Sequence, residues 1–143
     1  MKNKKTGFIR CKEPEEKKVK DIMSYGIPEV PEYSTVADVA KILINENALG
    51  VVVTNDKNDP LGAVSEIDIP KAFGRDFSRV KVTEIMSSPA KTIGMDESVK
   101  KAEEMMKNKN VHCLIVVDKK KRANGVVSVG DIIRKGSKTK VKL

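Results

Sequence analysis

The stretch that decides the fold is Gly62-Ala63-Val64-Ser65-Glu66-Ile67-Asp68-Ile69, because it returns as Gly125-Val126-Val127-Ser128-Val129-Gly130-Asp131-Ile132. In each copy a glycine precedes a short apolar strand, and a serine followed three residues later by an aspartate begins a helix. Such a junction gathers unpaired backbone N–H groups and the positive end of the helix dipole, which favour an anion. Taken singly, Ser-x-x-Asp also predicts a capping box that only stabilises the helix start.

The repeat extends well beyond this stretch. Residues 19–72 align with residues 82–135 at a constant offset of 63 and without a gap. The identical pairs are Val19/Val82, Ile22/Ile85, Met23/Met86, Ser24/Ser87, Val36/Val99, Asn45/Asn108, Asn47/Asn110, Val53/Val116, Lys57/Lys120, Gly62/Gly125, Val64/Val127, Ser65/Ser128, Asp68/Asp131 and Ile69/Ile132. The match indicates a tandem duplication. We therefore divide the chain into a basic arm (1–18), repeat 1 (19–72), a connector (73–81), repeat 2 (82–135) and a basic tail (136–143).

Periodicity predicts the same elements in both copies. One apolar helical face comprises Val36, Val39, Ala40, Leu43 and Ile44, and Val99, Ala102, Met105 and Met106 repeat it. Short β-branched runs at 51–53 and 114–117 predict buried strands, and polar turns connect them to second hairpin strands at 61–65 and 124–128. A further strand is expected at 27–30 and 90–93, after a helical lead-in, and a short strand at 7–11.

Each copy is thus predicted to be β-α-β-β-α, which makes the chain an α/β (α+β) protein. About fifty residues cannot close a good core alone, because so small a unit buries too little of its surface. We expect the two repeats to pack as a pseudo-symmetric pair, with the sheets joined through their helices.

Composition narrows the function. The net charge of +8 is unevenly spread, since residues 19–72 carry nine acids against four bases. Three Phe, two Tyr and no Trp disfavour binding of single-stranded nucleic acid by base stacking. Two cysteines, Cys11 and Cys113, make neither a disulfide framework nor a metal knuckle. With no apolar segment after the basic start and no run that spans a bilayer, a cytoplasmic protein is expected.

The motif order identifies a family resemblance. Val-x-(Asp/Glu)-Ile-Met-Ser, an amphipathic helix, Val111-His112-Cys113-Leu114-Ile115-Val116-Val117-Asp118 and then Gly-x-Val-Ser-x-x-Asp-Ile closely resemble the CBS domain, named after cystathionine β-synthase. Two in tandem resemble a Bateman module. The resemblance covers residues 19–135 and leaves segments too short for a catalytic domain, so we expect a stand-alone CBS pair that is not an enzyme.

The resemblance implies a regulatory module that binds an adenosyl ligand (AMP, ADP, ATP or S-adenosylmethionine) in clefts between the repeats. The aspartate of Ser-x-x-Asp would accept hydrogen bonds from the ribose hydroxyls. The resemblance further implies that each motif faces the lead-in and the helix-to-strand turn of the other repeat. One cleft would then comprise Ser128, Asp131, Met23, Ile27, Pro28, Leu49 and Gly50, and the other Ser65, Asp68, Met86, Ala90, Lys91, His112 and Cys113.

The two clefts are not expected to be equivalent. Lys91 and His112 would make the Asp68 cleft the tighter site for a charged nucleotide, whereas Glu29 and Glu32 would oppose phosphate in the other. For His112, a ligand contact and a partly buried structural role both stay open, and the simplest reading of Cys113 is a small core residue. Some of Arg75, Arg79, Lys81, Arg134 and Lys135 could neutralise phosphates, though charged side chains at these places are usually solvated.

The functional prediction is a sensor, expected as a homodimer, that reports an adenosyl ligand to an unidentified partner protein, with no required cofactor and no metal. The alternative is a nucleic-acid-associated module that uses the basic arm, the tail and the hairpin run Lys119–Arg122. An enzymatic role is a third alternative, which the sequence disfavours because it shows no nucleophile–base pair, metal cluster or phosphate loop of the P-loop kind.

Overall fold

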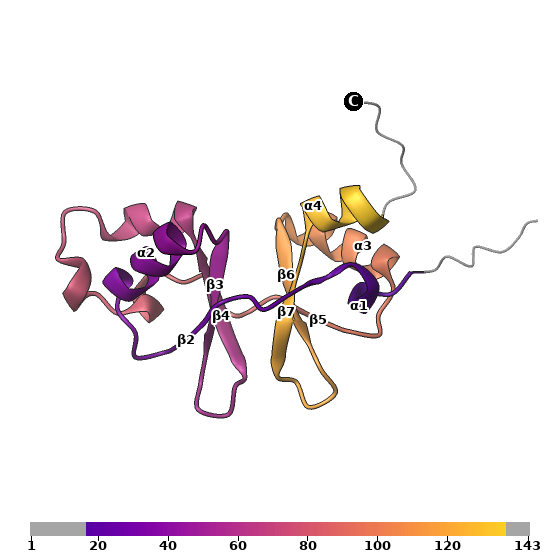
Figure 1. The fold of residues 1–143 in the computed structure, drawn as a ribbon, viewed down its shortest axis with the longest axis horizontal. Coiled ribbons are helices and arrows are strands. Elements are labelled where there is room, and N and C mark those ends of the chain that lie inside the picture. The colour runs from indigo at the N-terminus through magenta and orange to yellow at the C-terminus, as the bar shows by residue number, and fades with distance from the viewer. Residues whose placement is uncertain (1–16, 137–143) are drawn as a thin grey trace, which may run out of the picture.

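The structure, a computed structural model, describes residues 17–136. The strand predicted at 7–11, Cys11 and the tail from residue 137 lie outside this range. The described chain forms two half-domains, each with a sheet and helices (Figure 1). Within these residues no helix is long and apolar enough to cross a membrane.

The first half contains a three-stranded sheet in the order β2-β3-β4. Strand β2 (Glu29–Pro31) is parallel to β3 (Gly50–Thr54), which forms a hairpin with β4 (Pro60–Ser65). Helix α2 (Val36–Asn45) lies between β2 and β3, and Thr35 caps it by accepting a hydrogen bond from the Asp38 N–H at 3.2 Å. After β4 come three 3-10 helices, η2 (Glu66–Ala72), η3 (Phe77–Arg79) and η4 (Val82–Glu84).

The second half repeats this pattern and gains one strand. Strand β5 (Thr92–Gly94) is parallel to β6 (Cys113–Val117), which pairs with β7 (Ala123–Ser128), and α3 (Val99–Lys109) connects β5 to β6. The chain then closes with one helical turn, α4 (Val129–Asp131), and the π-helical turn η5 (Ile132–Gly136). The predicted β-α-β-β-α order is therefore confirmed, although β2 and β5 each begin two residues later than expected.

The additional strand comes from the other repeat. The lead-in consists of α1 (Val19–Ile22) and β1 (Ser24–Tyr25), and β1 is antiparallel to β7 in the second half. Conversely, the repeat 2 lead-in crosses to the first half, where Ser87 and Ala63 exchange backbone hydrogen bonds of 2.9 and 3.2 Å. In Figure 1 the indigo segment after α1 runs from one half across to β2 in the other. The two lead-ins are exchanged between the halves.

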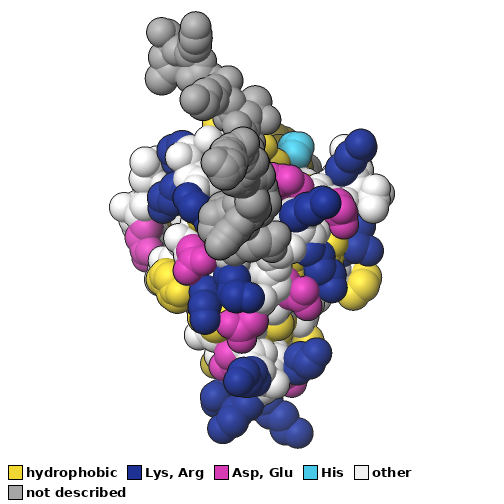
Figure 2. All heavy atoms as spheres, turned by 90° about the vertical axis from the view of Figure 1, so that its right-hand side faces the viewer, with side chains coloured by type: hydrophobic (Ala, Val, Ile, Leu, Met, Phe, Trp, Pro, Cys, Tyr) yellow, Lys and Arg dark blue, Asp and Glu magenta, His cyan; other side chains and the backbone are white. Residues whose placement is uncertain are grey.

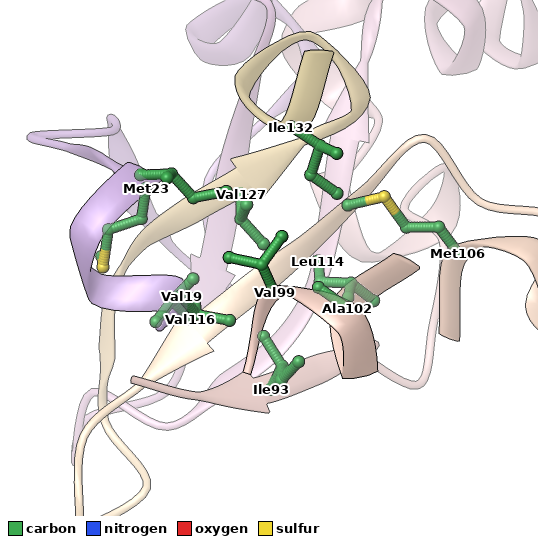
Figure 3. Packing of buried hydrophobic residues seen from close by; sticks show 11 residues of the cluster. Val19, Met23, Ile93, Val99, Ala102, Met106, Leu114, Val116, Val127 and Ile132 are labelled. Atoms are coloured by element: carbon green, nitrogen blue, oxygen red, sulfur yellow. The ribbon is translucent and has the colours of Figure 1, made fainter. Parts of the chain in front are cut away.

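Side-chain packing follows this exchange. Val19, Ile22 and Met23 are buried in the core of the second half, together with residues such as Val116 and Val127 (Figure 3). The core of the first half correspondingly contains Val82 and Ile85 of the repeat 2 lead-in; its other buried members are Val30, Val36, Val39, Leu43, Val51, Val53, Val64, Ala72 and Val80. Each core is thus completed by residues from the other repeat. This meets the need for a partner that the small size of one copy predicted.

The contact between the halves corrects one expectation. The sheets do not join through their helices, because the helices cover the outer faces and the sheets face each other (Figure 1). Val52 of β3 packs with Ile115 and Val117 of β6 in a third buried cluster. Since successive strand side chains point to opposite faces, Val51 and Val53 face their own helices while Val52 faces the other sheet. This explains why both strands are continuous apolar runs.

The expected helix face is also partly wrong. Val36, Val39 and Leu43 are buried, but Ile44 is 78% exposed. Ile42, in the same last turn, packs against the core beside Leu43, so Ile44 lies on a side of the helix that the described residues leave exposed.

Two glycines permit the exchanged lead-ins to approach the sheets. A Cβ placed on Gly62 would lie 2.5 Å from the Ser87 carbonyl oxygen and 2.9 Å from the Met86 sulfur. A Cβ on Gly125 would collide in the same way with the Ser24 carbonyl oxygen and would lie 2.7 Å from Met23 Cε. Glycine is therefore required at both places by close approach, although neither has a positive φ.

We expect Gly62→Ala to lower the free energy of unfolding by about 1–3 kcal/mol, the usual cost of forcing an extra methyl group into a packed site. Urea unfolding followed by circular dichroism measures this. Gly94→Ala is the matched control, because a Cβ there meets only Glu97 Cγ at an ordinary 3.6 Å. Equal unfolding midpoints for the two variants would contradict the close-approach argument.

Candidate functional site

The two copies of the opening stretch end at buried carboxylates. Asp131 is 2% exposed and Asp68 is 5% exposed, and each follows the last strand of its sheet. Burying a charged carboxylate without a partner costs free energy, so each of these aspartates needs polar contacts. Those contacts show which groups surround it. We call the surroundings of these two residues the Asp131 junction and the Asp68 junction.

At the Asp131 junction the predicted cap is present. The Ser128 N–H donates to Asp131 Oδ2 at 2.9 Å, and the Asp131 N–H donates to Ser128 Oγ at 3.1 Å. The exchanged lead-in supplies a further donor, since Ser24 Oγ lies 3.3 Å from Asp131 Oδ1. Arg134 Nη2 lies at the same distance from Oδ1. The carboxylate therefore contacts a group from each repeat, and its Oδ1 faces polar groups outside the cap.

At the Asp68 junction the carboxylate has a similar cap and a different cation. The Ser65 N–H donates to Asp68 Oδ2 at 2.9 Å. Lys71 Nζ lies 2.9 Å from Asp68 Oδ1 and 3.1 Å from the Ile85 carbonyl oxygen. Ile85 belongs to the exchanged repeat 2 lead-in, so this junction also contains groups from both repeats. In both junctions the cap orients the aspartate, which is compatible with the predicted ligand-binding role.

The strand register regroups the predicted cleft residues. Gly50 lies opposite Ser65 in the β3–β4 hairpin, and Cys113 lies opposite Ser128 in the β6–β7 hairpin. The Val129 N–H also donates to the His112 carbonyl oxygen at 2.9 Å. Each helix-to-strand turn therefore lies beside the motif of its own repeat, and the expected pairing with the opposite repeat is wrong. The reason is that β3–β4 and β6–β7 are hairpins within one copy, so their ends meet.

The lead-in residues divide between two places. Met23 lies beside Gly125 in the strand that leads to Ser128, and Met86 lies beside Gly62 in the strand that leads to Ser65. The chain then continues to the sheet of its own repeat, where the Pro28 carbonyl accepts from Val52 N–H at 3.0 Å and the Lys91 carbonyl accepts from Ile115 N–H at 2.9 Å. Ile27 and Ala90 pack against the cluster between the sheets.

This arrangement removes one of the reasons for preferring the Asp68 cleft, the expected presence of His112 there. His112 lies at the Asp131 junction, and the equivalent place at the Asp68 junction holds Leu49. Among the other predicted cations, Arg75 lies 3.2 Å from Glu84 and Arg79 lies 3.9 Å from Asp76. These two arginines are thus paired with acids of the connector and the η4 turn rather than with either buried aspartate.

Sequence reasoning missed three contributors: Ser24, Lys71 and Arg134 as partners of the buried carboxylates. Signals for them were present. Ser24 and Ser87 are identical in the two repeats, and Lys71 and Arg134 both follow their aspartate by three residues. A spacing of three places such a cation on the same helical face as the acid.

Cys113 differs from the expectation of a core residue, because it is exposed. Even so, surrounding protein atoms displace enough water from its sulfur to raise the pKa of the thiol, and the negative charge of Asp131 raises it further. Among the described residues no group of three His, Cys, Asp or Glu side chains could hold a metal ion.

Comparison with known proteins agrees with this geometry. The sequence model of the CBS domain matches residues 19–75 and again residues 82–138. This chain belongs to the CBS-domain family. It contains two CBS domains in tandem, and its α+β architecture is that of CBS pairs.

Solved structures of CBS pairs resemble it closely. A CBS domain protein of unknown function from Thermoplasma acidophilum superposes with a TM-score of 0.76 and 27% identity, covering 85% of this chain and 70% of that one. The CBS domain pair of protein MJ0100, in complex with 5′-methylthioadenosine and S-adenosyl-L-methionine, gives a TM-score of 0.73 and 29% identity over 82% of this chain and 94% of that one. A CBS domain protein from Pyrobaculum aerophilum complexed with AMP gives 0.73 and 27% identity, covering 80% and 89%.

This chain spans only part of the length of the curated relatives that it matches. A homoserine O-acetyltransferase from Methanococcus vannielii is 25% identical over 92% of this chain, and a probable arabinose 5-phosphate isomerase from Haemophilus influenzae is 31% identical over 77%. The match covers only 27% and 33% of those two proteins.

The electrostatic effect of Asp131 on the Cys113 thiol is testable by thiol chemistry. Because the carboxylate raises the pKa of the thiol, Asp131→Asn should lower that pKa and speed alkylation by iodoacetamide near pH 8, where the thiolate is the reacting form. The rate is measured against pH in a Cys11→Ser background, so that a single thiol reacts. If the chains with Asp131 and with Asp131→Asn react at the same rate in denaturant but at different rates when folded, the result supports the effect of Asp131 on Cys113. Equal rates in the folded proteins would contradict it.

Proposed function

We propose that this chain is a non-catalytic regulatory module that binds an adenosyl ligand at the Asp131 and Asp68 junctions. The observation that carries the proposal is the pair of buried carboxylates, each placed where a motif meets the exchanged lead-in of the other repeat. Two structurally similar CBS pairs support it, one complexed with 5′-methylthioadenosine and S-adenosylmethionine and the other with AMP.

The chemistry of the carboxylate suits a ribose. An ionised carboxylate only accepts hydrogen bonds and has about four acceptor positions, so it can accept both hydroxyls of a cis-diol. In each aspartate the cap occupies Oδ2, and the Oδ1 partners are side chains that can move. The adenine would lie against apolar strand ends and backbone groups of the regrouped clefts, which contain Met23, His112, Cys113 and Ser128 at one junction and Met86, Leu49, Gly50 and Ser65 at the other.

A regulatory output follows from this location. A ligand held at a junction would contact groups from both repeats, and it would favour the arrangement of the two halves in which those groups converge. Its effect is limited by the difference in its affinity between arrangements. A partner protein that contacts both halves would detect that change.

Nothing in residues 17–136 favours the nucleic-acid alternative over this proposal. Exposed Lys119, Lys120, Lys121 and Arg122 do gather at the tip of the β6–β7 hairpin, at the lower end of the molecule in Figure 2. Asp118 lies 3.6 Å from Arg122 and partly balances this charge, and exposed lysines at a hairpin tip are common without a ligand. The arm up to residue 16 and the tail from residue 137 lie outside the described residues.

Isothermal titration with AMP, ATP, S-adenosylmethionine and 5′-methylthioadenosine tests the proposal. At least one of these compounds should bind. Replacing either aspartate with asparagine keeps a capping side chain but removes the charge that attracts both hydroxyls, so we expect affinity at that junction to fall about tenfold or more. Asp56→Asn, on the exposed hairpin turn of repeat 1, is the matched control and should bind like the wild type. If none of the four compounds binds, the proposal fails.

The proposed homodimer has a separate test. Repeat 1 and the connector expose large apolar side chains at Tyr33, Ile44 and Phe73, which are 70%, 78% and 67% exposed, and a second copy of the chain would cover them. We expect light scattering after size exclusion to give the mass of two chains, and Ile44→Lys with Phe73→Ser to give the mass of one. A wild-type monomer at micromolar concentration would exclude the dimer.

A further inference from the structure

The two junctions share a buried carboxylate but differ at the positions around it. His112 corresponds to Leu49, Gly130 to Ile67, and Val129 to Glu66. Leu49 and Ile67 are 86% and 77% exposed, so their apolar side chains border the Asp68 junction without being part of the core. These differences alter the charge and polarity that a ligand would meet.

The cations at the two junctions also differ in how many donors they have left. Lys71 Nζ is close to both Asp68 Oδ1 and the Ile85 carbonyl oxygen, which occupies two of its three donors. Arg134 contacts Asp131 only through Nη2 at 3.3 Å, and its side chain is 65% exposed. Since a guanidinium has five N–H donors, most of those on Arg134 are available to a ligand.

Gly130 leaves room for the Arg134 guanidinium in this place. A Cβ on Gly130 would lie 2.9 Å from Arg134 Nη1, so the guanidinium rests directly over the glycine backbone. In repeat 1 the equivalent position carries the branched side chain of Ile67. The space over this position therefore holds a guanidinium in one junction and an apolar side chain in the other.

We propose that the Asp131 junction binds an adenosyl ligand with an anionic 5′-phosphate, and that the Asp68 junction binds one with an uncharged 5′-substituent. This inference rests on the proposed function. At the Asp131 junction, Arg134 and the His112 imidazole supply donors to phosphate oxygens, and arginine suits this group because its fork matches phosphate geometry. At the Asp68 junction, Glu66 opposes a phosphate and Leu49 with Ile67 provide apolar contact for a group such as methylthio.

Titration with AMP and 5′-methylthioadenosine distinguishes the two junctions. Asp131→Asn should reduce AMP binding about tenfold or more and leave 5′-methylthioadenosine binding unchanged, and Asp68→Asn should do the reverse. Arg134→Gln is a second variant that keeps the cap intact. It should weaken AMP by a similar factor and spare 5′-methylthioadenosine, whereas the matched Lys71→Gln should not weaken AMP.

The reciprocal change is Leu49→His combined with Ile67→Gly, which should allow AMP to bind at the Asp68 junction even when Asp131→Asn is present. Melting temperatures without ligand show whether each variant is folded. Equal affinity of both compounds at both junctions, or AMP binding that is insensitive to Arg134→Gln, would overturn this inference while leaving the proposed function intact. Failure of AMP and 5′-methylthioadenosine to bind the wild-type chain would overturn this inference, and failure of ATP and S-adenosylmethionine as well would overturn the proposed function.

Discussion

The structure depends on the close approach of each lead-in to the sheet of the other repeat. Gly62 and Gly125 make this possible, because any side chain at either position would meet the backbone of the crossing strand. The approach allows β1 to pair with β7 and Ser87 to pair with Ala63, and it carries Val19 and Ile22 into one core and Val82 and Ile85 into the other. Neither half-domain is complete without the other repeat, so the two are joined by core packing as well as by the sheet contact.

The same exchange creates the candidate sites. The lead-in ends next to the strand-to-helix junction, where the aspartate is already buried by its cap, and it places Ser24 beside Asp131 and the Ile85 carbonyl beside Lys71. A group that competes for these contacts would act on both repeats at once. In this way a local polar site is connected to the relative position of two packed halves, which is the physical requirement for a regulatory response to a ligand.

The duplication gives two junctions with the same backbone arrangement, but their side chains differ. The shared elements are the caps and the carboxylates, whose geometry is fixed by the backbone. The variable elements are side chains at the rim. At the Asp131 junction, Gly130 and Arg134 give an exposed guanidinium. At the Asp68 junction, Ile67 gives an apolar side chain, and the Lys71 ammonium is already bound to Asp68 and the Ile85 carbonyl oxygen. Rim positions can vary in this way because they support little of the core.

The sequence by itself determined the duplication, the order of elements, the caps and the two aspartates, because these depend on local periodicity and on contacts three residues apart. It also showed that one repeat could not bury its own core. Only the tertiary structure decided how that need is met: lead-ins are exchanged, and the sheets rather than the helices face each other. It also decided the grouping of the sites. His112 lies with Asp131 because hairpin register brings the ends of β6 and β7 together, and Ser24 joins them from a distant part of the chain. Contacts of that kind depend on how strands pair across the fold, which a pattern of residues along one chain does not specify.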